Sequence, residues 1–173
     1  MNEIDDVNKS RISDRDYVSN VVLEMTAAIE RDPRDRRAYM MRGSHYLDGG
    51  NFEEAVRDLT IAIELEPADP MAYNNRGVAY RRLQRPEEAI ADFDKAIELS
   101  PEYREAFNNR GMTRSDAYDY EAAVADFTTA IEIDPGYWFA YNHRAMARWA
   151  LGDREGAAQD YERVARLIGR RRS

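Results

Sequence analysis

The sequence contains no cysteine and only two histidines, His45 and His143, among its 173 residues. Without thiolates the chain can form neither a disulfide framework nor a cysteine-ligated metal site. The two histidines lie far apart in the sequence, and no Cys/His, Ser/His or metal-ligand cluster accompanies them. We therefore expect no catalytic residues, no metal and no cofactor, and hence a protein that is not an enzyme.

Basic residues and long apolar runs are also scarce. Acidic residues outnumber basic ones by 33 to 25, which gives a formal net charge of −8. A nucleic-acid partner would require a basic stripe that neutralises phosphates, so the charge argues against one. No stretch approaches the ~20 apolar residues of a membrane span, and residues 1–13 lack the apolar core of a secretory signal. These features predict a cytoplasmic protein with neither nucleic acid nor membrane as its partner.

What the sequence does contain is a repeat with a fixed period. The segment Ala72-Tyr-Asn-Asn-Arg-Gly-Val returns 34 residues later as Ala106-Phe-Asn-Asn-Arg-Gly-Met, and it occurs 34 residues earlier as Ala38-Tyr-Met-Met-Arg-Gly-Ser. Four prolines follow the same interval: Pro33, Pro67, Pro101 and Pro135. A period of this length is typical of a solenoid, in which each unit covers the apolar face of its neighbour.

Each unit of 34 residues predicts two helices with a short connection. In the first unit, Asp35 can cap a helix over residues 36–48, because its side-chain oxygen can accept from free N–H groups. Gly49-Gly50 can end that helix, and Asn51 can open the second. Before this unit, apolar residues spaced by three and four over residues 15–31 predict one more helix. We therefore expect nine helices.

Small and large residues occupy fixed columns of the unit. The eighth residue is small, and the 24th is large: Gly43, Gly77, Gly111 and Ala145 against Leu59, Phe93, Phe127 and Tyr161. Small residues let the two helices approach closely, and large ones fill the space beside them. Together with the closing prolines, this pattern resembles the tetratricopeptide repeat. The resemblance implies an all-α fold, a right-handed α-solenoid of helix-turn-helix repeats, and a non-catalytic protein-protein interaction module, an adaptor or scaffold.

The resemblance also implies a domain organisation. It covers residues 36 to about 169 as four repeats, preceded by a half repeat, so that the repeat domain spans residues 15–169. Residues 1–14 are predicted to be a flexible N-terminal segment, and residues 170–173 a basic tail. The four repeats are residues 36–69, 70–103, 104–137 and 138–169.

Two columns of the unit are charged in every repeat, and the one at the seventh position departs from the family pattern, which usually has leucine there. Here the seventh residue is always arginine, and the 23rd is always aspartate: Arg42, Arg76, Arg110 and Arg144 with Asp58, Asp92, Asp126 and Asp160. Both columns lie beside core positions. Arginines left free for an anionic ligand would strand four partly buried aspartates. We therefore interpret the columns as a structural ladder of Arg–Asp pairs.

In the family, the remaining face of each first helix looks into a concave groove that binds extended peptides or partner helices. In three successive repeats this face carries a row of polar residues: Asn74, Asn75, Asn108, Asn109, Asn142 and His143. Asparagine within a helix costs about 0.5 kcal/mol relative to alanine, so its recurrence suggests a use. The row is similar to the asparagine ladder with which some members hold a peptide backbone. Local bonds between repeats explain it equally well.

The same face supplies the other candidate peptide-binding residues. They combine flexible apolar side chains, suited to varied ligands, with two charges: Met71, Met112, Met146, Phe139, Arg37 and Glu105. The family's carboxylate clamp would need lysine and arginine at positions that are mostly Met, Ser, Asn and Glu here. We therefore expect a protein or peptide partner in the groove, but not one held through an acidic C-terminal tail.

Two alternative functions remain open. The last predicted helix ends in Leu167-Ile168, and Trp149 and Leu151 lie in the same repeat. Solenoids normally close with a polar capping helix. An uncapped apolar end therefore predicts a homodimer through the C-terminal repeat, or a self-assembling scaffold. The other alternative is a regulatory domain of a larger enzyme.

Overall fold

The computed structural model describes residues 14–169; the N-terminal segment before Asp14 and the basic tail predicted above lie outside these residues. The described chain consists of nine α-helices, without a strand, which confirms the predicted all-α fold. The helices are α1 (Asp14–Arg31), α2 (Arg36–Asp48), α3 (Phe52–Leu65), α4 (Pro70–Arg82), α5 (Pro86–Leu99), α6 (Arg104–Asp116), α7 (Tyr120–Ile133), α8 (Trp138–Ala150) and α9 (Arg154–Gly169).

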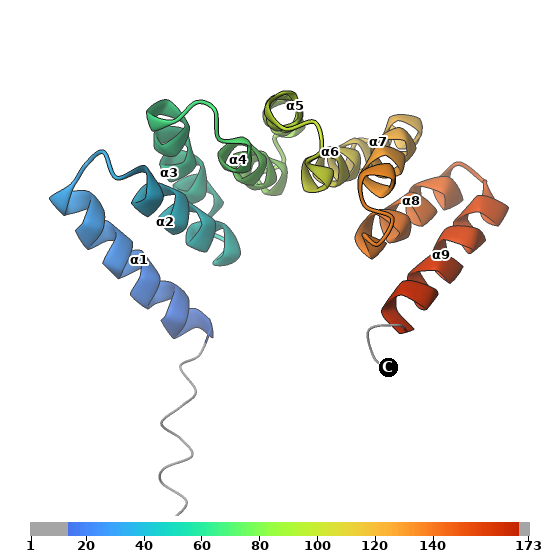
Figure 1. The fold of residues 1–173 in the computed structure, drawn as a ribbon, viewed down its shortest axis with the longest axis horizontal. Helices are drawn as coiled ribbons and strands as arrows, with labels where there is room; N and C mark the ends of the chain where they lie inside the picture. The colour runs from blue at the N-terminus through green and yellow to red at the C-terminus, as the bar shows by residue number, and fades with distance from the viewer. Residues whose placement is uncertain (1–13, 170–173) are drawn as a thin grey trace, which may run out of the picture. The chain divides into compact units, whose positions relative to one another are not determined.

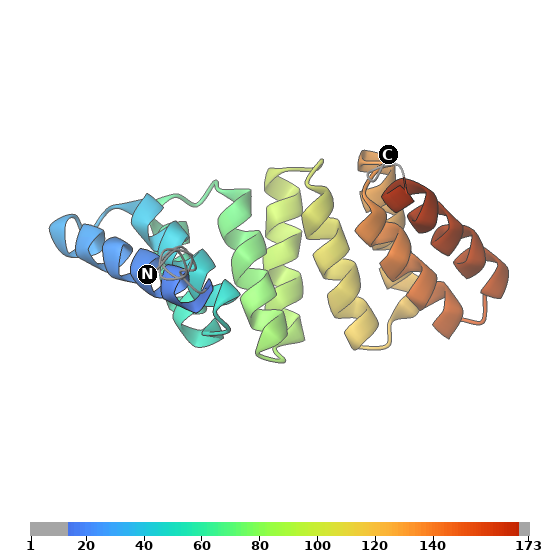
Figure 2. The same ribbon diagram turned by 90° about the horizontal axis from the view of Figure 1, so that it is seen from below.

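The helices divide between two compact units, residues 1–67 and 68–173. In the first unit, α2 packs against both α1 and α3. In the second, α4 pairs with α5, α6 with α7 and α8 with α9, and these pairs stack in chain order (Figure 2). The first helices of the pairs also touch, α4 with α6 and α6 with α8, on the inner side of this unit (Figure 1). We call the surface formed by α4, α6 and α8 the even-helix face.

Short polar side chains start several of the helices as the sequence predicts. The Asp35 carboxylate accepts a hydrogen bond from the Ala38 backbone N–H at 3.1 Å, and Asp69 accepts from Met71 N–H at 2.9 Å. Such bonds satisfy amide groups that have no partner within the helix. Asn51 does stand just before α3, but its side chain makes no capping bond.

The two helices of a repeat approach closely at the glycine column. A Cβ atom at Gly77 would lie 2.7 Å from Cε1 of Phe93, and one at Gly111 would lie 2.7 Å from Cε1 of Phe127. Both phenylalanines are buried. The fourth repeat differs, because Tyr161, its equivalent of Phe127, is 42% exposed. No described helix follows α9 to cover it.

The predicted Arg–Asp ladder is present in all four repeats. Each arginine donates from Nε and Nη2 to both oxygens of the aspartate sixteen residues later, as Arg76 does to Asp92 at 2.8 Å for both bonds. The other three pairs bond between 2.6 and 3.1 Å: Arg42–Asp58, Arg110–Asp126 and Arg144–Asp160. All four aspartates are buried. Each aspartate charge is compensated by a bidentate ion pair with its arginine. This geometry reduces the free-energy cost of burying a carboxylate.

Some of these arginines also reach back to the preceding repeat. Nη1 of Arg42 donates to the Thr26 hydroxyl at 2.9 Å, and Nη1 of Arg144 donates to the Thr128 hydroxyl at 3.0 Å. Arg110 donates in the same way to Asp94. The ladder therefore joins the two helices of a repeat and also links neighbouring repeats.

The ladder should contribute much more stability than an exposed ion pair. Asp92→Ala removes the carboxylate that compensates the partly buried Arg76 guanidinium, so we expect a loss of about 3 kcal/mol in the free energy of unfolding. Arg76→Leu should cost a similar amount, and the double variant with leucine at both positions should be close to neutral. Urea denaturation of the set measures these differences.

The control is Glu98→Ala, which breaks the exposed Lys95–Glu98 ion pair and should cost only a small fraction of the loss expected for Asp92→Ala, because water screens exposed charges. If Asp92→Ala and Arg76→Leu each cost as little as this control, the buried pairs would not contribute more stability than an exposed ion pair does.

Candidate functional site

The even-helix face carries most of the polar row and three exposed apolar side chains. Met71 on α4, Phe139 on α8 and Met146 on α8 are 54%, 45% and 57% exposed. Met112 on α6 and Glu105 at the start of α6 are half-buried, and Glu105 accepts a hydrogen bond from Arg104 at 2.9 Å. Arg37 is exposed but belongs to α2, in the first unit.

The asparagines of this face bond from one repeat to the next. Nδ2 of Asn109 on α6 donates to Oδ1 of Asn74 on α4 at 2.9 Å. One repeat later, Nδ1 of His143 on α8 lies 2.9 Å from Oδ1 of Asn108 on α6 and donates to it. Each bond joins the fifth residue of one repeat to the sixth of the next. Bonds between repeats, one of the two interpretations of the polar row, are therefore present.

Two members of the row are buried, although their columns were expected to face the groove. Asn74 is 6% exposed and Asn108 is 3% exposed. Their carbonyl oxygens accept the bonds just described, and Nδ2 of Asn108 also approaches Sδ of Met112 at 3.5 Å. Burial is tolerated because these polar groups keep hydrogen-bond partners. Asn75, Asn109 and Asn142 are half-buried, so part of each of these residues is accessible to solvent.

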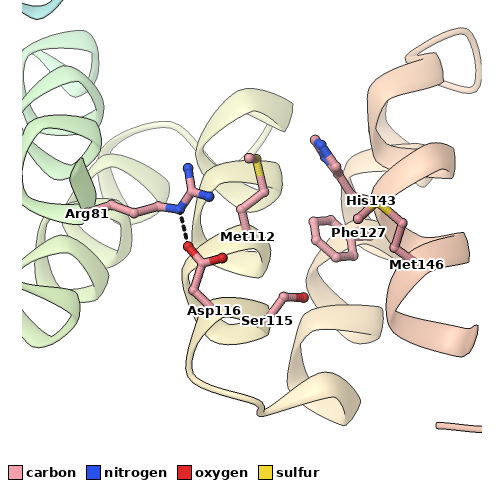
Figure 3. Close-up of a pocket in the computed structure, with 7 residues that line it drawn as sticks. All are labelled: Arg81, Met112, Ser115, Asp116, Phe127, His143 and Met146. Carbon is pink, nitrogen blue, oxygen red and sulfur yellow. Dashed lines mark hydrogen bonds and ion pairs between the residues drawn. The ribbon is translucent and has the colours of Figure 1, made fainter. Parts of the chain in front are cut away.

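A hollow of about 200 Å³ lies beside this row, between α6 and α8. Figure 3 shows Phe127, His143 and Met146 on one side of it, with Met112 and Ser115 facing them and Arg81 joined to Asp116 at the edge. The walls are mostly apolar. The sequence had indicated only the two methionines and His143 as site residues, and it missed Arg81, Ser115, Asp116 and the buried Phe127 as lining residues.

Charge around the hollow is concentrated in one ion pair. Nε of Arg81 on α4 donates to Oδ2 of Asp116 on α6 at 2.7 Å. The pKa of His143 is lowered from its ordinary value of 6.5, chiefly because the ring is buried and also because Arg81 is positively charged. The ring centroid lies 5.6 Å from that of Phe127. His143 is therefore neutral near pH 7, with the proton on Nδ1 that the bond to Asn108 requires.

Two negative findings apply to the described residues. No group of three or more histidine or acidic side chains is placed to hold a metal ion. No helix there combines the length and the apolar character that crossing a bilayer requires. The side chains of the even-helix face thus offer amide and imidazole hydrogen-bonding groups beside an apolar surface.

Comparison with known proteins identifies the repeat. A family model described as tetratricopeptide repeat matches residues 24–58, 41–104 and 108–170. No curated protein sequence gave a match. The structure of MamA from Desulfovibrio magneticus RS-1 is similar with a TM-score of 0.82, at 16% identity over 92% of this chain and 90% of that one. At this identity the similarity shows the fold.

Two further proteins of similar structure have a peptide-binding site or a bound peptide. YrrB, described as a TPR protein with an unusual peptide-binding site, has a TM-score of 0.70 at 20% identity, over 87% of this chain and 78% of its own. The first TPR of Spaghetti (RPAP3), bound to the HSP90 peptide SRMEEVD, has a TM-score of 0.66 at 27% identity, over 70% of this chain and 96% of its own.

The buried state of His143 predicts a pH-dependent stability. Because its pKa is lower in the folded chain than in the unfolded chain, the unfolded chain binds the proton more readily. Above about pH 6.5 His143 is neutral in both states and costs the folded chain nothing. As the pH falls below that value and through the folded-state pKa, the free energy of unfolding decreases.

His143→Asn removes this titration while keeping a donor for Asn108, since asparagine already fills the same column as Asn109. We expect the variant to gain stability relative to the wild type below about pH 6.5. Urea denaturation of both proteins from pH 8 to pH 5 measures this difference, and a constant difference over the whole range would contradict it.

Proposed function

Because the chain belongs to the tetratricopeptide repeat family, we propose that it is a non-catalytic interaction module that binds an extended peptide segment of a partner protein on the even-helix face. Similar structures support this proposal, since the RPAP3 domain is bound to a peptide and YrrB is described as having a peptide-binding site. In this proposal the partner is a protein rather than nucleic acid or a membrane, and the compartment is the cytoplasm. The net charge of −8 agrees with that choice of partner.

The observation that carries the proposal is the juxtaposition of exposed apolar side chains and a row of amides on one face. Met71, Phe139 and Met146 keep about half of their surface in water. Exposed apolar surface beside polar groups is typical of a binding site for a partner. An extended peptide needs both components, hydrogen bonds for its backbone and apolar contacts for its side chains.

The polar row then divides into two roles. The buried Asn74 and Asn108 hold Asn109 and His143 in place through the bonds between repeats. An amide has two donor hydrogens and two acceptor sites, so Asn109 keeps hydrogen-bonding capacity after its bond to Asn74. We assign the contacts with a peptide backbone to Asn75, Asn109 and Asn142.

The remaining candidates would select among peptides. Met71, Met112, Met146 and Phe139 supply adaptable apolar contacts, and Glu105 biases the choice by its charge. Arg37 stays a candidate for the corresponding surface of α2, within the first unit.

Removing accessible side chains of this face should weaken binding without unfolding the protein. The probe is a synthetic peptide chosen on the wild type from a displayed library of random dodecapeptides. Asn142→Ala should lower its affinity by about 1 kcal/mol, the contribution of one hydrogen-bonding side chain. Met71→Ala should lower it through lost apolar contact. Fluorescence anisotropy titrations and melting curves measure both effects.

Asn109→Ala is the contrasting variant, because it leaves the buried Asn74 oxygen without its donor and should cost about 1–3 kcal/mol of stability as well. Unchanged affinity for both Asn142→Ala and Met71→Ala would move the peptide site away from this face.

A second candidate function is self-association through the last repeat. The large residue of the 24th column is fully buried in the first three repeats, whereas Tyr161 is 42% exposed. Trp149 and Leu151, in the same repeat, are 55% and 41% exposed. We propose that a second copy covers Tyr161 on α9 together with Trp149 and Leu151 at the end of α8, because apolar groups of this size gain by leaving water.

Light scattering after size exclusion tests the second candidate. The mass of the wild type should rise from 20.0 kDa toward twice that value as the protein concentration increases. Tyr161→Glu should keep the protein monomeric, because a charge would then be buried at the contact. A monomeric mass for the wild type at the highest concentration would exclude this surface as a dimer interface.

A further inference from the structure

The hollow beside the polar row exists because one interaction between repeats occurs at one junction and not at the next. At the junction of α4 and α6, Arg81 spans the gap and bonds to Asp116. The residues at the same two repeat positions one junction later are Ser115 on α6 and Ala150 on α8. Neither residue is charged, so these two positions cannot form an ion pair between α6 and α8. The space that Arg81 fills at the first junction is left open at the second.

Ser115 is also the one small residue of its column. The twelfth residue of the four repeats is otherwise large: Leu47, Arg81 and Trp149. The serine hydroxyl lines the hollow, and the buried ring of Phe127 closes it from the side of α7. The hollow is therefore open because Ser115 is short, and the ring of Phe127 forms its floor.

The size and lining of the hollow indicate what it can hold. Sites for small ligands and cofactors usually enclose about 300–1,000 Å³, whereas this one encloses about 200 Å³. It suits one side chain better than a whole molecule. Its walls are Phe127, Met112 and Met146, and the methionines can adapt to the shape of an inserted group.

Charge excludes the other classes of side chain. The Arg81 guanidinium and the Asp116 carboxylate at the edge are paired with each other, so an inserted lysine or arginine would find no unpaired anion there and would lose its hydration without compensation. An aspartate or glutamate would have to bury its charge against Phe127 without a cation of its own, which is costly. A small side chain such as alanine would leave the space unfilled.

We propose that this hollow is the anchor pocket of the even-helix face and takes one large apolar side chain, leucine, methionine or phenylalanine, from an extended peptide of the partner. The inference rests on the proposed function, because it needs a peptide that lies along α4, α6 and α8. The accessible amides hold the backbone of the peptide with little regard to sequence. The hollow then fixes which residue of the peptide lies over α6 and α8, and so supplies sequence preference.

Filling the hollow tests the assignment. A random dodecapeptide library displayed on phage is selected on the wild-type protein, and the enriched peptides are synthesised with a fluorescent label. We expect them to share one leucine, methionine or phenylalanine. Ser115→Leu should weaken their binding at least about tenfold, since the anchor loses its burial. Ala91→Leu, which adds the same side chain at an exposed position of α5, should leave binding unchanged.

Two further measurements make the result specific to the hollow. Ser115→Arg fills it with the residue that α4 already carries in this column, so it serves as a second variant should Ser115→Leu not fold. Replacing the shared apolar residue of the peptide by alanine should weaken binding to the wild type about tenfold and binding to the Ser115 variants very little, because these two changes remove the same contact.

The outcomes separate this proposal from the one on which it rests. Full affinity for both folded Ser115 variants, or enriched peptides without a shared apolar residue, would overturn the anchor pocket. If Asn142→Ala and Met71→Ala still weaken binding in that case, peptide binding on the even-helix face stands without the pocket. If they do not, or if no peptide is enriched on the wild type, the proposed function fails as well.

Discussion

The bidentate bond between an arginine and a buried aspartate is the interaction on which the rest of this structure depends. A buried carboxylate must be paired or the fold loses several kcal/mol. In each repeat both oxygens of the aspartate accept from one guanidinium sixteen residues away. The planar guanidinium permits little variation in that geometry, so the pair fixes how the two helices of a repeat lie against each other. Where Arg144 also reaches Thr128, the pair sets the spacing between repeats as well. The even-helix face has a regular spacing because these bonds repeat.

The fold could be predicted from the sequence because its determinants are local and recur with the period. A proline or aspartate at a helix start acts on amides within the same turn. The partner of Gly77 is Phe93, and the partner of Arg76 is Asp92, each one helix away in the same repeat. The Arg–Asp pairing has the same residue types in all four repeats, and the other pairing sets a small residue against a large one each time. Both columns can therefore be interpreted without knowledge of the distant chain. Asn51 shows the limit of such local patterns, since it stands at a helix start and still makes no cap.

The candidate site was predicted less completely because it depends on the register between neighbouring repeats. The sequence placed Asn74 and Asn109 on one face, but their hydrogen bond joins the fifth residue of one repeat to the sixth of the next. Whether an amide turns inward to such a bond or outward to solvent depends on side-chain rotamers, which periodicity does not determine. The hollow beside Ser115 was missed for another reason, because it follows from a contact that one junction has and the next lacks. Comparing the columns of Arg81 and Asp116 between repeats would have revealed it.

Columns that are identical in every repeat cannot distinguish one stretch of a bound peptide from another, since each repeat offers it the same groups. They can set spacing, as the Arg–Asp pairs do. Sequence preference therefore has to come from columns in which the repeats differ. The twelfth column of the unit is such a column, because Arg81 bonds α4 to α6 whereas Ser115 leaves a hollow open between α6 and α8. The sixth is another, because His143 takes the place that Asn109 holds one repeat earlier and brings a titrating ring to the same hollow. Both irregularities meet at the junction of α6 and α8, so under the proposed function that junction is the part of the face best able to discriminate between ligands.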